Sequence, residues 1–351
     1  MVGWFSKRRA SPIGIDVGTR SVKLLQLDGE YTRIREAARW DISCDEGGDP
    51  RDRDAEVAEA IRRACEGRDF RGREAVFSIH SGDLFVQNIR VPQVAGEELT
   101  RTVWAEAAGR LPFASDEAEV RFLEAADVRQ GDNLRREVIL LACHRPVVER
   151  TVALAEETGL RAVAIDVEPA ALLRCYAQQF RRDQDQGQCS MFVNVGGSRT
   201  AAVIGRDFDP MFVKYIDVGG RQMDEAVAGQ LGMPQADATA LRRHNGDRRA
   251  DRRDPEVARS IAESTRPVLD RLANELSMCI RYYSVTFRGQ PLSRIVLGGG
   301  EATEGLVEWL DGRLGAPCEL GDPLRSYRKS LPPGRVGQWD VAAGLALRQV
   351  I

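Results

Sequence analysis

The chain has 351 residues, enough for two lobes with large buried cores. Hydrophobic residues make up 43% of it and charged residues 29%, which is typical of soluble globular proteins. The formal net charge of -3 gives no basic field for nucleic acid, and no apolar run approaches the roughly 18 residues that span a bilayer. Met1 to Ser11 lacks the order of charges and apolar residues of a secretory signal, so we expect a protein retained inside the cell.

The cysteines and histidines form no recognisable metal or redox motif. The seven cysteines are scattered without a CxxC pair, and the three histidines stand apart from one another. Most of the cysteines lie in apolar sequence, as buried small hydrophobic side chains do. We therefore do not expect a zinc site.

The first part of the chain predicts a β-meander with one helix. Two short strands flank a glycine turn at Gly18, and further apolar alternation follows. Acidic residues open the helix, and Gly67 follows its end. The predicted strands are Ile13–Val17, Ser21–Leu27, Thr32–Ile42, Ala75–Ile79 and Leu84–Val91, and the helix is Asp54–Cys65.

The pattern changes at Pro92. A helix, two strands, a second helix and a strand follow one another, an order that differs from the meander before it. The predicted elements are Gly96–Arg110, Val120–Ala125, Glu137–Ala142, Pro146–Glu157 and Arg161–Ile165. We interpret residues 92–162 as an inserted small α+β subdomain.

The second half repeats the glycine-tipped hairpin of the first, at Gly196-Gly197. The predicted strands of this half are Cys189–Val195, Thr200–Ile204, Met211–Val218 and Arg294–Leu297. Its predicted helices are Arg221–Leu231, Pro255–Phe287, Thr303–Leu314 and Trp339–Val350, and a further helix, Glu168–Arg181, precedes it. The stretch Arg242–Asp254 holds six arginines and three aspartates. It predicts a solvated irregular loop, with a patch for anionic lipid or an acidic partner as the alternative.

The first glycine turn offers the groups that hold phosphate. A tight hairpin leaves backbone N–H groups free for phosphate oxygens, hydroxyls add donors, and a lysine neutralises charge. An aspartate at the end of a buried strand suits a hydrated magnesium ion. The candidates are Asp16, Gly18, Thr19, Ser21 and Lys23, although a plain hairpin with a surface lysine remains the alternative.

Two later glycine clusters complete the pattern. The second turn has the same order of strand, glycine, hydroxyl and strand, so two such hairpins facing each other could clamp a triphosphate. In the third cluster a buried strand runs into three glycines and a helix, which lets a flat ring lie on bare backbone. The candidates are Gly196, Gly197, Ser198 and Thr200 in the second turn, Gly219 and Gly220 before a helix, and Gly298, Gly299 and Gly300 in the third cluster. Taken singly, each cluster is also compatible with an ordinary turn.

Together, in this order, the three clusters resemble the phosphate-1, phosphate-2 and adenosine motifs of the superfamily of actin, sugar kinases and heat-shock chaperone ATPases. Within it the chain resembles the PilM family of type IV pilus assembly, related to the cell-division protein FtsA. The resemblance rests on Ser21–Leu27, Glu97–Leu99, Leu111–Phe113, Ile165–Glu168, Ile280–Tyr283, Gly298–Ala302 and the closing Ala342–Arg348.

This resemblance implies an α/β, actin-like (ribonuclease H-like) fold of two lobes with an inserted 1C-type α+β subdomain. The implied parts are 1–91 and 163–187 for subdomain 1A, 92–162 for 1C, 188–225 and 262–335 for 2A, 226–261 for a small 2B region, and 336–351 for a closing helix on 1A. It also implies ATP and Mg²⁺ between the lobes, with Asp16 holding the ion through water. Glu168, in the connecting helix, would orient the attacking water, unless it is only a helix-start acid favoured by the dipole.

The same resemblance implies a partner and a location. The partner is the N-terminal cytoplasmic tail of a PilN-like bitopic membrane protein, docked in a groove involving 1A and 1C. The protein would then be a cytoplasmic scaffold at the inner face of the cytoplasmic membrane, in a type IV pilus or a related platform, with homo-oligomers possible.

Three departures from the family pattern bear on catalysis and on the sugar. Asn194 stands where the family usually has Asp, so it is a weak metal ligand, and Arg199 stands where a small residue is usual. At ~5 Å and an effective dielectric of ~20, the lost charge is worth roughly 3 kcal/mol, on the order of a hundredfold in rate. No lysine in Gln235–Arg243 matches the family's ribose-side lysine. We therefore expect ATP binding with slow or absent hydrolysis.

Three other functions remain as alternatives. A small-molecule kinase of the same superfamily would need a substrate pocket with an aspartate base, and no such motif stands out. An FtsA-like filament former would normally end in an amphipathic membrane helix, whereas this sequence stops at Ile351 after the closing helix. A non-catalytic adaptor without nucleotide is also consistent with Asn194.

Overall fold

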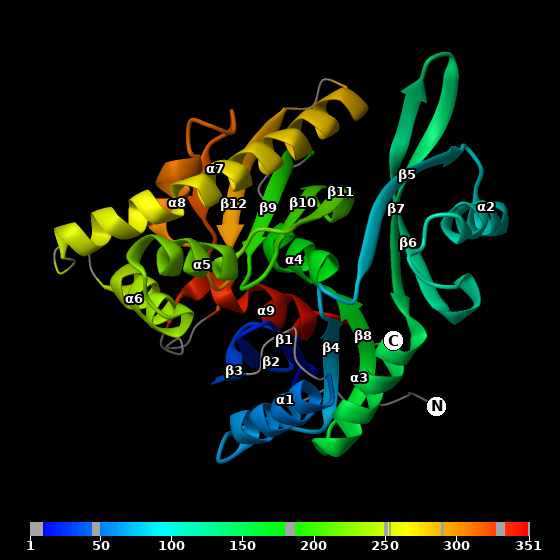
Figure 1. Ribbon diagram of the computed structural model, residues 1–351. Coiled ribbons are helices and arrows are strands. Elements are labelled where there is room, and N and C mark those ends of the chain that lie inside the picture. Colours follow the sequence, from blue (N-terminus) through cyan, green and yellow to red (C-terminus); the bar gives the residue numbers. More distant parts are fainter. Residues whose placement is uncertain are drawn as a thin grey trace.

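The computed structural model describes residues 10–43, 50–179, 187–248, 252, 254–288, 291–327 and 334–349. Residues 1–9, most of the N-terminal segment from which we expect retention inside the cell, lie outside the described part of the chain. Two five-stranded sheets form the two lobes, and a three-stranded sheet forms a third unit beside them (Figure 1). In the described ranges, no helix combines the length and apolar character needed to cross a membrane.

The sheet of the first lobe has the strand order β3-β2-β1-β4-β8. β1 pairs antiparallel with β2 and parallel with β4, and β8 extends the parallel part. α1 and α3 cover one face, where Ile61 and Ala155 pack against Ile15 and Leu24. The strands are β1 (Ile13–Val17), β2 (Ser21–Leu27), β3 (Ile34–Asp41), β4 (Glu74–Ile79) and β8 (Arg161–Val167), and the helices are α1 (Pro50–Cys65) and α3 (Arg145–Glu157).

The second lobe repeats this topology as β11-β10-β9-β12-β13. An antiparallel meander again leads to two parallel strands, so the glycine turn after β9 is the counterpart of the turn after β1. The strands are β9 (Cys189–Val195), β10 (Thr200–Arg206), β11 (Asp209–Ile216), β12 (Leu292–Gly298) and β13 (Cys318–Leu320). The helices are α5 (Gly220–Leu231), α6 (Gln235–Asp247), α7 (Pro255–Thr286) and α8 (Glu304–Leu310).

Two helices join the lobes. α4 (Glu168–Ala177) and α9 (Asp340–Ala346), which follows the 3-10 turn Val336–Trp339, lie between the two sheets (Figure 1). Leu172 and Leu345 share one apolar core with Val76 of the first lobe and Val203 of the second. Because this core is common to both sheets, α4 and α9 join the two lobes.

The third unit is the sheet β5-β7-β6 with α2 on one face. Its elements are β5 (Phe85–Pro92), α2 (Gly96–Ala108), the 3-10 turn Ser115–Glu117, β6 (Ala118–Gln130) and β7 (Asn133–His144). β5, which the sequence assigns to the first lobe, pairs with β7, whereas α3 packs on the first lobe. We therefore propose residues 85–144 for this unit in place of 92–162; alternation alone does not tell which sheet a strand joins.

Candidate functional site

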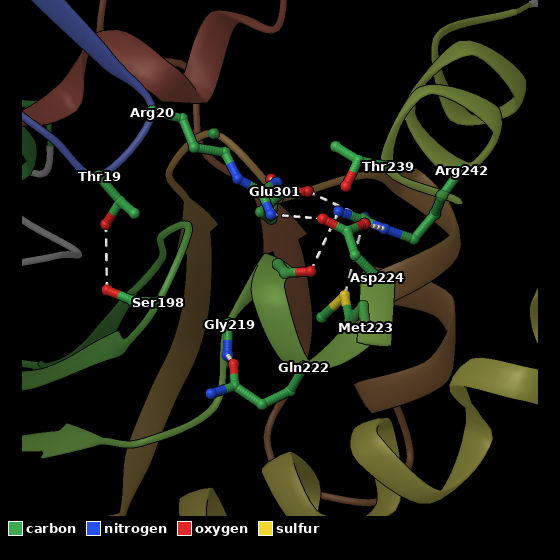
Figure 2. A network of polar contacts seen from close by, with 12 residues as sticks. Thr19, Arg20, Ser198, Gly219, Gln222, Met223, Asp224, Thr239, Arg242 and Glu301 are labelled. Atoms are coloured by element: carbon green, nitrogen blue, oxygen red, sulfur yellow. Dashed lines mark hydrogen bonds and ion pairs between the residues drawn. The ribbon is translucent and has the colours of Figure 1, made fainter. Parts of the chain in front are cut away.

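The two glycine turns meet across the cleft between the lobes. Oγ1 of Thr19 lies 3.0 Å from Oγ of Ser198 (Figure 2). Both hairpins close in the same way, because the N–H of Gly18 donates to O of Ser21 and the N–H of Gly196 donates to O of Arg199. The geometry on which a shared polyphosphate site depends is therefore present.

Glycines make close contacts in and behind the second turn. A Cβ on Gly197 would stand 3.0 Å from Cβ of Thr19, and one on Gly219 would stand 2.8 Å from O of Gly196. Gly219 also donates its N–H to Oε1 of Gln222, which fixes the start of α5 behind the second turn (Figure 2). Gly219 therefore supports the second turn from behind.

A small cavity of about 90 Å³ lies between the turns. Most residues predicted from the sequence line it: Asp16, Gly18, Thr19, Ser21, Lys23, Glu168, Asn194, Gly196, Gly197, Ser198, Gly299 and Gly300. Thr200, Gly219, Gly220 and Gly298 do not line it. Thr200 is fully buried and donates to O of Val218, so its hydroxyl is engaged within the second lobe.

A second cavity, of about 460 Å³, lies between α1, α3 and the second turn. The two cavities share Val17, Ser78, His80, Ser198 and Arg199. Ligand pockets usually measure roughly 300–1,000 Å³, so the small cavity alone is too small for a nucleotide.

An ion pair lies on the floor of the small cavity. Nζ of Lys23 donates to Oδ2 of Asp16 at 2.8 Å, because the antiparallel register places the two residues opposite each other. Mg²⁺ usually keeps several waters and is held by one or two carboxylates together with substrate phosphates. Although no group of three or more His, Cys, Asp or Glu gathers as a metal cage in the described ranges, Asp16 fits this looser arrangement.

Glu168 begins α4 and faces the same cavity. Its Oε2 accepts a hydrogen bond from the hydroxyl of Tyr215 at 3.0 Å. Burial, followed by the negative charge of Asp16, raises the pKa of Glu168 to about 8. The carboxyl is therefore mostly protonated at neutral pH and is a poor base until a cation offsets the charge of Asp16.

Asn194 is hydrogen-bonded to a buried carboxyl. Its Nδ2 donates to Oδ1 of Asp340 at 2.9 Å, and burial raises the pKa of Asp340 to about 7. With Nδ2 engaged, Oδ1 of Asn194 lies on the side of Gly299, 2.8 Å from where a Cβ of that residue would be. An acceptor oxygen, rather than a carboxylate, therefore faces the third glycine cluster.

Gly220, Gly298 and Gly299 make close contacts with neighbouring groups. Gly299 has φ +89°, and a Cβ there would also meet O of Val195 at 2.5 Å. A Cβ on Gly298 would lie 2.3 Å from Oδ2 of Asp340, and one on Gly220 would lie 2.6 Å from Cδ of Glu301. Gly298 and Gly220 therefore make room for buried carboxyl groups rather than contacting the small cavity.

Four charged side chains form a ring of ion pairs beside Gly299 and Gly300, at the edge of the small cavity. Arg20 donates to Asp224 and Glu301, and Arg242 donates to both carboxylates from the other side (Figure 2). We call Arg20, Asp224, Arg242 and Glu301 the charge ring. Burial works against ionised Glu301, but Arg242, Arg243 and Arg20 hold its pKa below the ordinary value.

The charge ring corrects the sequence interpretation of Arg242–Asp254 as a loop. α6 continues to Asp247, and Arg242 is buried; residues 249–251 and 253 lie outside the described part. Ala238 and Arg242 are four residues apart, so they lie on the same face of α6, and this spacing could have indicated that Arg242 faces inward. The spacing does not reveal which carboxylates Arg242 contacts.

Arg199 is a further contact between the lobes. Its Nη1 donates to O of Ser81, in the loop after β4, and its Nε pairs with Asp217 at 2.9 Å. The side chain that replaces a small residue of the family pattern therefore ties the second turn to the first lobe.

Comparison with known proteins agrees with this architecture. The solved PilM–PilN type IV pilus biogenesis complex is similar over 97% of this chain and 98% of that chain, at 22% identity and a TM-score of 0.77. The ethanolamine utilization protein EutJ from Carboxydothermus hydrogenoformans is similar over 96% and 89%, at 17% identity and a TM-score of 0.57. The predicted actin-like fold with an inserted α+β unit is confirmed.

The family comparison covers almost the whole chain. Residues 14–350 match the model of the type IV pilus assembly protein PilM. The match includes both glycine turns, the third glycine cluster and the closing helix. The chain therefore belongs to the family of type IV pilus assembly protein PilM.

Proposed function

We propose that this protein is a cytoplasmic, ATP-binding scaffold of a type IV pilus or related assembly platform at the inner face of the cytoplasmic membrane. The observation that carries the proposal is the 3.0 Å contact between Thr19 and Ser198. It brings two backbone-rich turns to one point, where their N–H groups can share a polyphosphate.

The residues around this point fit a magnesium nucleotide. Gly18 and Gly196 would shape the two turns, because their N–H groups close the hairpins. The backbone of Gly197 and the hydroxyls of Thr19, Ser21 and Ser198 would bind phosphate, with Lys23 neutralising charge. Asp16 would hold Mg²⁺ through water, with Oδ1 of Asn194 as a weaker acceptor. Gly299 and Gly300 would lie against the base. Bound Mg²⁺ would offset phosphate charge and so ease attack by water.

Hydrolysis in this site would be slow or absent. Asn194 contributes no charge to the ion where the family pattern has a carboxylate, a difference worth on the order of a hundredfold in rate. Without a bound cation, burial and Asp16 raise the pKa of Glu168 to about 8, so any help from Glu168 as a base depends on how far the cation offsets the charge of Asp16. Nucleotide would then serve to set the conformation of the lobes rather than to be consumed.

The partner would be the N-terminal cytoplasmic tail of a PilN-like bitopic membrane protein. The structurally similar PilM protein is described in complex with PilN, and this chain has the same fold over nearly its full length. The tail would dock between the first lobe and the third unit. Through this tail the protein would be held at the membrane.

A second candidate, an adaptor that binds no nucleotide, is favoured by the size of the cavity, about 90 Å³. Calorimetric titration with ATP, with and without Mg²⁺, separates the two. Saturable binding that Lys23→Ala weakens, with little phosphate release over hours, supports the scaffold. No heat of binding supports the adaptor, and turnover as fast as that of an actin-type enzyme contradicts the proposed slow hydrolysis. A pull-down with synthetic N-terminal tails, with and without ATP and Mg²⁺, tests the partner.

A further inference from the structure

The charge ring uses every oxygen of its two carboxylates. Oδ2 of Asp224 and Oε1 of Glu301 accept from Arg20, while Oδ1 of Asp224 and Oε2 of Glu301 accept from Arg242. The side chains of Asp224 and Glu301 are 0% and 2% exposed, and that of Arg20 is 23% exposed. The two carboxylates are therefore buried, and Arg20 is the most exposed member of the ring, ahead of Arg242 at 9%.

Its members come from different lobes. Arg20 stands next to Thr19 at the tip of the first glycine turn, whereas the other three members belong to α5, α6 and the loop after β12 in the second lobe (Figure 2). Arg20 is thus inserted into a preformed acceptor on the opposite lobe. Two neighbouring residues of one turn, Thr19 and Arg20, therefore both bridge the cleft.

The acceptor keeps counter-charges when Arg20 leaves. Arg242 contacts both carboxylates, and Nη1 of Arg335 lies 3.6 Å from Oε2 of Glu301 while donating to O of Gly300. Two buried carboxylates thus retain two guanidinium groups, which avoids the large cost of an unpaired buried charge. Departure of Arg20 is therefore compatible with a folded second lobe.

Arg20 also stands where a bound nucleotide would extend. Arg20, Glu301 and Gly300 line the same small cavity as the two turns. A ligand with phosphates at Thr19 and Ser198 would reach toward Gly299 and Gly300 on its sugar and base side. Such a ligand would enter the space that Arg20 lines.

We propose that Arg20 is an intramolecular latch that holds the cleft shut without nucleotide and is displaced when nucleotide enters. The nucleotide part of this inference rests on the proposed function; closure by Arg20 does not. When only a fraction of molecules is open, apparent affinity falls by that fraction. Arg20→Ala should therefore bind ATP about five- to tenfold more tightly, because a larger fraction is open.

The latch is tested on three variants of the full-length protein. Arg20→Ala removes both contacts, and Arg20→Lys keeps the charge but lacks the planar fork that reaches two carboxylates. Arg35→Ala is the control, since Arg35 lies on the neighbouring strand and pairs with Asp69 away from the cleft. Amide hydrogen exchange is measured without ligand, and calorimetric titration with Mg²⁺ and ATP follows.

The expected result is faster exchange at both glycine turns in Arg20→Ala, a smaller rise in Arg20→Lys and none in Arg35→Ala, with unchanged exchange in β9. ATP binding tightens in the same order. Unchanged exchange at the turns, or weaker ATP binding in Arg20→Ala because Arg20 contacts phosphate, overturns the latch. Faster exchange with no ATP binding by any variant overturns the proposed nucleotide function and leaves closure by Arg20 standing.

Discussion

Asn194 and Asp340 share one hydrogen bond, from Nδ2 to Oδ1 over 2.9 Å, although 146 residues separate them in the chain. This contact gives a structural reason for the amide at position 194. A second carboxyl there would face Asp340, whose pKa burial already raises to about 7. One of the two carboxyl groups would then have to stay protonated.

Asn194→Asp alone should therefore fail to produce fast hydrolysis and should lower stability, more at pH 8 than at pH 6. The double variant Asn194→Asp, Asp340→Asn should recover stability, because the new amide can donate to the new carboxylate. It also places the charge beside the cleft, which should strengthen Mg²⁺-dependent ATP binding and raise phosphate release by up to ~100-fold. The measurements are thermal unfolding at both pH values and phosphate release. Equal loss of stability in the single and the double variant would show that positions 194 and 340 cannot exchange amide and carboxylate.

Glu168 makes stability depend on pH. Its folded pKa is raised from 4.5 to about 8, so the unfolded chain loses its proton first as pH rises. Below pH 4.5 Glu168 is protonated in both states and has no effect on stability. Between pH 4.5 and about 8 the free energy of unfolding falls as pH rises, because only the unfolded chain releases this proton readily. Glu168→Gln should melt as the wild type does at pH 5 and at a higher temperature at pH 8 to 9. The exposed Glu149→Gln serves as control, and a gain that is equal at both pH values would rule out titration as the cause.

Glu137 anchors the third unit to the second lobe. It is fully buried, accepts from Nε of Arg90 at 2.8 Å and also from the hydroxyl of Tyr282. Arg90 donates in addition to Thr286 of α7. The unit continues the chain of the first lobe, and this cluster holds it to the second lobe.

Glu137→Ala should cost ~2–3 kcal/mol in the free energy of unfolding, because it removes the charged acceptor of both Arg90 and the hydroxyl of Tyr282. Tyr282→Phe should cost ~1–3 kcal/mol, since it removes one hydrogen bond to a buried charged group. Glu124→Gln breaks an exposed ion pair with Arg136 in the same sheet and should cost under ~1 kcal/mol. Urea unfolding measures all three; an equal effect of Glu124→Gln and Glu137→Ala would refute an anchoring role.

The elements that could be predicted from the sequence are those set by neighbouring residues. The order of strand, glycine and hydroxyl is the same around Thr19 and Ser198, so both hairpins, and their arrangement as facing turns, could be predicted. The partner of Arg20 is 281 positions away at Glu301, and no local pattern encodes such a contact. The burial of Arg242 was missed for the same reason, since a run of arginines is usually solvated. The sheet to which Phe85–Pro92 belongs likewise depends on a distant strand.

Gly344 tests how closely α4 and α9, the helices that join the lobes, must pack. A Cβ there would stand 2.0 Å from O of Ala171, so α9 and α4 cross with backbone against backbone. Gly344→Ala would have to push the helices apart and disturb the core shared by the lobes. It should therefore lower the free energy of unfolding by ~1–3 kcal/mol or more and weaken ATP binding.

Gly229→Ala provides the matched control. Gly229 lies inside α5, and nothing stands within 4 Å of its Cβ position. That change should instead stabilise the protein by roughly 0.5–1 kcal/mol, because alanine loses less backbone freedom in a helix than glycine does. Chemical denaturation of both variants compares glycine-to-alanine changes at a helix position packed against another backbone and at one with free space around it. If Gly344→Ala stabilised as much as Gly229→Ala, α4 and α9 could separate at no cost, and the core shared by the lobes would not depend on their close packing.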